Sequence, residues 1–184
     1  MSDKLADFAA FARLLADAAR RETLERAAFA VEDKGHAGWF DPVTEADRGA
    51  ERVIRQLIEY RHPSHGITGE EFPDRRAQSG WTWSLDPVDG TRAYICGLPS
   101  WTTLIALLED GRPVLGLIDV PRVGERYIGW GGTALLVQGS RETPLRASGC
   151  ASLAEARVAT TDPYLFEGAE AEGFERIRRA ARLT

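Results

Sequence analysis

The chain has 184 residues, of which 43% are hydrophobic and 28% charged, and its formal net charge at pH 7 is −5. This composition is ordinary for a soluble globular protein, and an acidic chain without a basic stripe is a poor candidate for nucleic-acid binding. No uninterrupted apolar segment is long enough to cross a bilayer, and two cysteines cannot form a disulfide framework. A cytoplasmic protein of one domain, or slightly more than one, is therefore expected.

Two amphipathic helices are predicted in the first third of the chain. Apolar residues recur at helical spacing over residues 3–29 and again over 44–62. At the start of the second helix, Thr44 is placed as the N-cap, and Asp47 would complete a capping box. Pro63 ends this helix because proline cannot continue the hydrogen-bond ladder.

The hydrophobic period then changes to that of strands. Short apolar runs at "GITG", "WTWSL", "WTTLIALLED", "PVLGLIDV", "RYIGW" and "TALLVQG" are separated by turn sequences such as "DGR" and "PRVGE". Strands joined by short turns favour an antiparallel sheet, and helices that precede such a sheet favour layered packing. The expected fold class is α/β, built as an α+β layered sandwich with N-terminal helices packed on a largely antiparallel sheet.

The pattern changes again near Ser148. Residues 156–161, "ARVATT", are predicted as a further strand, and residues 169–182 as a helix. We therefore expect an N-terminal α+β part over 1–147 and the beginning of a second α/β part over 148–184. Its sheet would be incomplete because a single strand cannot cover its own edges.

The stretch "WSLDPVDGT" places two carboxylates in one bend. Asp86 follows an apolar run, Pro87 stiffens the backbone, and Asp89 follows the Val88 carbonyl. Carboxylate and carbonyl oxygens in a tight bend are the hard donors that Mg²⁺ prefers. The same letters are also typical of an ordinary Asx turn, so the stretch alone leaves both interpretations open.

Gly90 and Thr91, which follow this bend, suit a bound anion. Glycine permits a positive φ and the close approach of a ligand. The backbone N–H groups of Gly90 and Thr91 would form a nest for phosphate oxygens.

Further carboxylates lie in two other segments. Glu70 and Glu71 follow a short apolar run, and paired carboxylates at a strand end repel each other unless they are solvated or share a cation. A solvated loop is the alternative there. Asp47 is a capping residue, and the cap would also hold its carboxylate in a fixed place near the helix start.

Taken together and in this order, "DPVTEAD", "GEE" and "DPVDGT" resemble the inositol monophosphatase family of Mg²⁺-dependent phosphate monoesterases. The resemblance extends from about residue 34 to residue 139. The version "LDPVDGTRAYICGLPSWTTLIAL" is most similar to the histidinol-phosphate phosphatase branch, in which an arginine follows the threonine.

The resemblance implies a role for each matching residue. Two or three Mg²⁺ ions would be held by Glu70, Asp86, Asp89 and the Val88 carbonyl. Thr91, hydrogen-bonded to Asp47, would orient the attacking water, Glu70 would help to take its proton, and the Gly90 and Thr91 amides would hold the phosphate. Arg92 is a possible substrate contact, with a structural ion pair as the alternative.

The resemblance also implies a substrate and partners. The expected substrate is histidinol phosphate, in histidine biosynthesis, with inositol 1-phosphate or another small monoester as the alternative. A homodimer is expected, with no nucleic-acid or membrane partner.

Similar proteins continue past this length and carry a later Trp-Asp motif that completes the second metal site. Residues 148–184 contain no such motif. A C-terminally truncated chain is therefore expected, and a catalytically impaired fragment is the further alternative.

Other residues are expected to be structural. His62 and His65 are placed in a loop rather than in a metal cluster that would include His36. The cysteines, Cys96 and Cys150, fit small buried side chains better than reactive thiols. Core packing is expected of Trp81, Trp83, Trp101 and Trp130.

Overall fold

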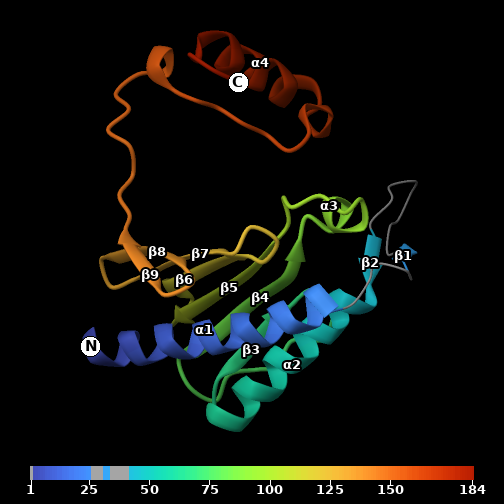
Figure 1. The fold of residues 1–184 in the computed structure, drawn as a ribbon, viewed down its shortest axis with the longest axis vertical. Coiled ribbons are helices and arrows are strands. Elements are labelled where there is room, and N and C mark those ends of the chain that lie inside the picture. The colour runs from blue at the N-terminus through green and yellow to red at the C-terminus, as the bar shows by residue number, and fades with distance from the viewer. Residues whose placement is uncertain (1, 26–30, 34–41) are drawn as a thin grey trace. The chain divides into compact units, whose positions relative to one another are not determined.

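The computed structural model describes residues 2–25, 31–33 and 42–184 (Figure 1). His36 and the first residue of the "DPVTEAD" motif, Asp41, lie outside the described residues. The chain divides into two compact units, Met1–Leu145 and Arg146–Thr184. The assignment of separate functional parts to 1–147 and 148–184 stays a prediction.

The first unit is a mixed seven-stranded sheet with two long helices. Its elements are α1 (Ser2–Glu25), β1 (Val31–Asp33), β2 (Pro42–Thr44), α2 (Glu45–Arg61), β3 (Gly66–Gly69), β4 (Trp81–Asp89), α3 (Thr91–Ile95), β5 (Thr102–Glu109), β6 (Arg112–Val120), β7 (Glu125–Trp130), β8 (Thr133–Gln138) and β9 (Arg141–Pro144). The sheet runs in the order β3 to β9. Only β3 and β4 pair in parallel within it. β1 and β2 form a separate antiparallel pair.

Both long helices pack on the same face of the large sheet. Figure 1 shows α1 and α2 side by side, with α1 against β5, β6 and β7 and α2 against β4. This arrangement confirms the predicted layered α+β fold with N-terminal helices on a largely antiparallel sheet.

The core lies between these helices and the sheet because each element buries one stripe of apolar residues. Along the strands buried and less buried positions alternate, as the two-residue period requires. Buried core residues include Phe8, Phe11, Leu15, Ile54, Ile58, Trp83, Leu85, Ile105, Leu107, Leu117 and Ile128. The expected core role of the tryptophans is confirmed, since Trp83 and Trp101 are fully buried and Trp81 and Trp130 pack against the core.

The second unit consists of η1 (Leu153–Glu155), η2 (Pro163–Leu165) and α4 (Gly168–Ala180). Phe166 and Phe174 stack with their ring centres 4.9 Å apart. The strand predicted over 156–161 is wrong: within the described residues this segment makes only an isolated bridge, between Arg157 and Leu183. Its β-branched letters are typical of a strand, but no neighbouring strand is present there to pair with it.

Three further features differ from the sequence-based expectation. β4 does not end before the acidic bend but continues through it to Asp89. The short strands β1 and β2 were not predicted. Cys96 and Cys150 are exposed rather than buried.

Among the described helices, none combines the length and the apolar character that a membrane span requires.

His65 is a titratable group inside the core. It is only 6% exposed, and its Nδ1 accepts a hydrogen bond from Trp83 Nε1 at 3.1 Å. Burial, followed by the nearby charges of His62 and Lys4, lowers the pKa of His65 to about 4. The folded chain therefore holds this imidazole neutral over a pH range in which the unfolded chain protonates it.

We expect the free energy of unfolding to fall as the pH is lowered from about 6.5 towards 4, because only the unfolded chain takes up this proton there. The loss should reach about 2 kcal/mol near pH 5. In His65→Gln, which keeps an acceptor for Trp83, this part of the pH dependence should disappear. Urea unfolding of both proteins at several pH values measures it, and parallel pH curves would contradict the assignment to His65.

Candidate functional site

The acidic bend is a β-bulge at the end of β4. Opposite β5, Asp86 pairs with Leu104 and Asp89 pairs with Thr102, so that three steps along β4 face two steps along β5. A bulge adds an unpaired residue and re-aims the side chains beside it. Pro87 lies inside the bulge. Proline has no backbone N–H group, and the strand ladder is interrupted there, so no ladder hydrogen bond is lost.

Gly90 turns the chain out of the bulge and into α3. Its φ is +88°, in the left-handed region that favours glycine. A β-carbon at this position would lie 3.3 Å from the carbonyl oxygen of Ser100. Both the backbone angle and the close approach therefore require glycine, in agreement with the sequence-based expectation of a positive φ.

Asp47 completes the predicted cap of α2 and also lies within hydrogen-bond distance of Thr91. One carboxylate oxygen, Oδ2, accepts hydrogen bonds from the backbone N–H of Thr44, at 2.9 Å, and from the Thr44 hydroxyl, and this completes the capping box of α2. The other oxygen, Oδ1, lies 3.4 Å from the hydroxyl of Thr91. The helix cap thus aims a buried carboxylate at the residue that follows the bend.

The Thr91 hydroxyl stands between two acceptors. It lies 3.0 Å from the carbonyl oxygen of Val88 and 3.4 Å from Asp47. Because a hydroxyl carries one proton, it donates to one of them at a time. The shorter distance favours the Val88 carbonyl, which the sequence suggested as a metal ligand.

Carboxylates from three elements act on Asp86. Burial raises the pKa of Asp86 to about 7, and the nearby negative charges of Glu70, Asp89 and Asp47 contribute to the shift. These residues stand at the end of β3, at the end of β4 and at the start of α2. The fold therefore brings the three predicted segments into one electrostatic neighbourhood.

Glu70 and Asp86 line the same cavity, of about 720 Å³, on the first unit. Most of its wall is formed by β4 to β7, including residues Leu104, Ala106 and Ile118. These alternate along their strands with the core residues, so the cavity lies on the sheet face that α1 and α2 do not cover. Space for a ligand thus adjoins the acidic residues.

Within the ranges that the structure describes, no three His, Cys, Asp or Glu side chains form a group that could hold a metal ion. The donor chemistry still suits a hard divalent cation, because Mg²⁺ prefers carboxylate and carbonyl oxygens. After burial, the charges of neighbouring carboxylates contribute to the raised pKa of Asp86, and like charges that repel one another are stabilised by a shared cation. The ligand set of Glu70, Asp86, Val88 and Asp89 stays a prediction.

Sequence reasoning missed the residues that hold the Glu70 loop. Glu51, fully buried in α2, accepts the backbone N–H of Glu71 at 2.8 Å and Arg55 Nε at 2.7 Å. The Arg55 guanidinium also donates to the carbonyls of Phe72 and Pro73, each at 3.0 Å. Four residues apart on a helix, Glu51 and Arg55 look like an ordinary surface ion pair.

Two more side chains complete the site. Thr102 donates a hydrogen bond from its hydroxyl to Asp89 Oδ2 at 3.3 Å. Arg92, the possible substrate contact, is exposed in the first turn of α3. Its position beside the Gly90–Thr91 turn is compatible with substrate contact but does not test it.

A family model described as the inositol monophosphatase family matches residues 4–182. A relative named bifunctional phosphatase IMPL2, chloroplastic, from Arabidopsis thaliana is 38% identical over 96% of this chain and 50% of its own length. A histidinol-phosphatase from Chlorobaculum parvum is 38% identical over 77% of this chain and 54% of its own.

Among solved structures, an inositol monophosphatase from Zymomonas mobilis superposes with a TM-score of 0.79 at 38% identity, over 97% of this chain and 68% of that one. The chain spans about half the length of the Arabidopsis thaliana and Chlorobaculum parvum relatives. Enzymes of the matching family are metal-dependent.

Asp86→Asn should stabilise the metal-free chain at alkaline pH. Wild-type stability should decline as the pH rises from about 4 to about 7, because the folded chain keeps a proton on Asp86 that the unfolded chain releases. The asparagine variant carries no such charge. Urea unfolding with a chelator should give a gain on the order of 1 kcal/mol at pH 8, where solvent screens part of the effect, and a much smaller gain at pH 4. An equal gain at both pH values would contradict this explanation.

Gly69→Ala should destabilise the chain by roughly 1–3 kcal/mol. A β-carbon at residue 69 would overlap the Glu51 carboxylate, which is buried and held by two donors and so cannot swing away. Gly116→Ala in β6 is the matched control, since nothing lies within 4 Å of its β-carbon position. Its free energy of unfolding should stay within about 0.5 kcal/mol of wild type. Equal effects of the two substitutions in urea unfolding would argue against a Glu51 carboxylate held rigidly beside Gly69.

Proposed function

The chain belongs to the inositol monophosphatase family, and on that premise we propose that it is a Mg²⁺-dependent phosphatase of small phosphate monoesters. The observation that carries the proposal is the convergence of Asp47, Glu70 and Asp89 on Asp86, beside the glycine turn that leads into Thr91. An acidic cluster next to backbone N–H groups is a combination that serves both a divalent cation and a phosphate.

A cation is required for electrostatic reasons. A phosphate monoester carries up to two negative charges at neutral pH, and several carboxylates would repel it from this site. Glu70, Asp86, Asp89 and the Val88 carbonyl would hold two or three Mg²⁺ ions. When bound, Mg²⁺ neutralises charge on the phosphoryl oxygens and lowers the pKa of a bound water.

The protein groups then orient the reactants. The backbone N–H groups of Gly90 and Thr91 donate to phosphate oxygens, which fixes the phosphorus atom. When the Thr91 hydroxyl donates to Asp47, its lone pairs can accept a hydrogen bond from the attacking water and so direct that water at phosphorus. Glu70, exposed at the cavity, helps to take the proton that the water releases. Water itself is the nucleophile, so no covalent phosphoenzyme forms.

Histidinol phosphate is the proposed substrate. The support is the histidinol-phosphatase from Chlorobaculum parvum and Arg92 directly after Thr91, a feature of that branch. Inositol 1-phosphate is the second candidate, because the superposed structure from Zymomonas mobilis is an inositol monophosphatase with the same 38% identity. Comparing kcat/KM for the two esters decides between them, and a strong preference for inositol 1-phosphate would reverse the assignment.

Asp89→Asn should lower Mg²⁺-dependent phosphate release by roughly 100-fold or more, with an unchanged far-UV circular dichroism spectrum, because it removes a ligand and leaves the fold. Glu70→Gln should reduce the rate more than Glu71→Gln. Phosphate release from histidinol phosphate, together with calorimetric titration of Mg²⁺, measures both effects. Mg²⁺ binding without turnover would identify a catalytically impaired chain, and full activity of Asp89→Asn would remove Asp89 from the site.

A further inference from the structure

A row of polar side chains crosses the helix-facing side of the sheet. Thr103 on β5 pairs with Asp119 on β6, and Asp119 pairs with Arg126 on β7. Thr103 and Asp119 are fully buried, and Arg126 is 7% exposed. Buried polar groups destabilise a protein unless they are hydrogen-bonded, so the partners of this row show what it does.

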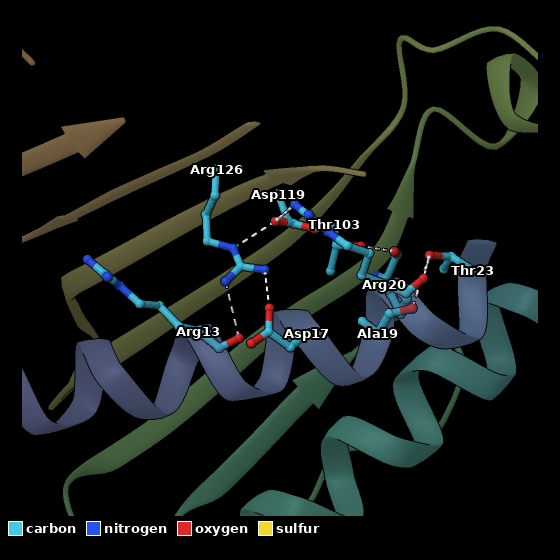
Figure 2. Close-up of polar contacts among 9 residues, drawn as sticks. Arg13, Asp17, Ala19, Arg20, Thr23, Thr103, Asp119 and Arg126 are labelled. Carbon is cyan, nitrogen blue, oxygen red and sulfur yellow. Dashed lines mark hydrogen bonds and ion pairs between the residues drawn. The ribbon is translucent and has the colours of Figure 1, made fainter. Parts of the chain in front are cut away.

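Asp119 and Arg126 attach the sheet to α1, as Figure 2 shows. Arg20 donates to both oxygens of Asp119, from Nε at 2.9 Å and from Nη2 at 2.7 Å, and Arg126 Nε donates to Oδ1 at 2.7 Å. Arg126 also donates to Asp17 at 2.7 Å and to the Arg13 carbonyl at 3.4 Å. Buried, bidentate ion pairs of this kind fix the position of α1 over β6 and β7.

Thr103, the third member of the row, contacts the acidic bend instead. Its hydroxyl donates to the carbonyl oxygen of Pro87 at 2.7 Å. In the β4–β5 register, Thr103 lies between the partners of Asp86 and Asp89, where the bulge interrupts the ladder. The hydroxyl thus satisfies a buried carbonyl at the point of interruption, where an unpaired carbonyl would be costly.

We propose that Thr103 is a positioning residue for the acidic bend. By fixing the Pro87–Val88 peptide group, its hydroxyl sets the direction in which Asp86, the Val88 carbonyl and Asp89 present their oxygens. The proposal rests on the proposed function, because the bend matters for activity only if these oxygens hold the cation. Asp119, ion-paired to α1, is the cross-strand neighbour that keeps β5 in register beneath the bend.

The end of α1 also holds the far side of the bend. Tyr94 of α3 donates its hydroxyl to the carbonyl of Thr23 at 3.0 Å, and its ring meets Trp101 edge to face at 5.0 Å. Thr23 lies one turn after Arg20. The segment from β4 to α3 is therefore held from the core side at Pro87 and again at Tyr94.

The test is a calorimetric titration of the full chain with Mg²⁺. Thr103→Val keeps the shape and removes the hydroxyl, and it should weaken binding roughly 10- to 100-fold. Thr103→Ser should bind Mg²⁺ with wild-type affinity, and Thr103→Ala should bind it as weakly as Thr103→Val does. The serine and alanine variants differ only in the hydroxyl.

Thr143→Val is the control. It changes a threonine in the same way, but on β9, where Thr143 is half-buried and pairs with Leu136 of β8, four strands away from β5, so its Mg²⁺ affinity should equal that of wild type. Wild-type affinity in Thr103→Val would overturn the proposal, as would equal weakening by Thr143→Val.

A second measurement does not need the cation. Amide hydrogen exchange of the metal-free chain should be faster in Thr103→Val than in wild type over residues 83–97, and unchanged over 125–138. Thr103→Ser should exchange as wild type. Unchanged exchange over 83–97 overturns the role of Thr103.

The two measurements separate the two claims. If the wild-type chain takes up no Mg²⁺, the proposed function fails for this chain, while the exchange result still decides whether Thr103 holds the bend.

Discussion

The burial of Asp86 beside other carboxylates is the constraint on which the rest of the site depends. Burial first, and then the charges of Glu70, Asp89 and Asp47, raise its pKa to about 7, so the folded chain holds this carboxyl group where its charged form is disfavoured. The fold supplies the opposing restraint through hydrogen bonds to backbone groups. Asp47 is fixed by the α2 cap, and the Glu70 loop is fixed by Glu51 through the N–H of Glu71. A shared divalent cation stabilises the folded state of such a site, and without a cation the site lowers the stability of the fold.

Local sequence patterns predicted the elements and part of the site. The helical and strand periods located α1, α2 and the strands from β3 to β8, and the capping box and the positive φ of Gly90 follow from short-range chemistry in the sequence. The failed strand over 156–161 shows the opposite case. Strand propensity is local, but a strand exists only where a neighbour completes its ladder, and here only an isolated bridge forms.

The residues that hold the site could not be found from the sequence because their partners are distant in the chain. Glu51 and Arg55 have the four-residue spacing of a surface ion pair on a helix. Only the fold shows that Glu51 also accepts the Glu71 N–H and so holds the Glu70 loop. Thr103 is one threonine among several in apolar strands, and its meaning comes from the bulge in the neighbouring strand. A bulge is a property of register between two strands, and register depends on pairing rather than on local propensity.

The alternation of side chains along β4 explains how a rigid core and a charged site share one strand. Leu85 points into the core beneath the helices, while the next residue, Asp86, lines the cavity on the other face. A regular strand would keep the core side and the site side separate. The bulge breaks this separation at Pro87, whose carbonyl meets the Thr103 hydroxyl on the core side. Asp119, ion-paired to Arg20 and Arg126, is thus linked to the acidic bend through its cross-strand neighbour Thr103 and the hydrogen bond from Thr103 to Pro87. Neither Asp119 nor Arg126 lines the cavity.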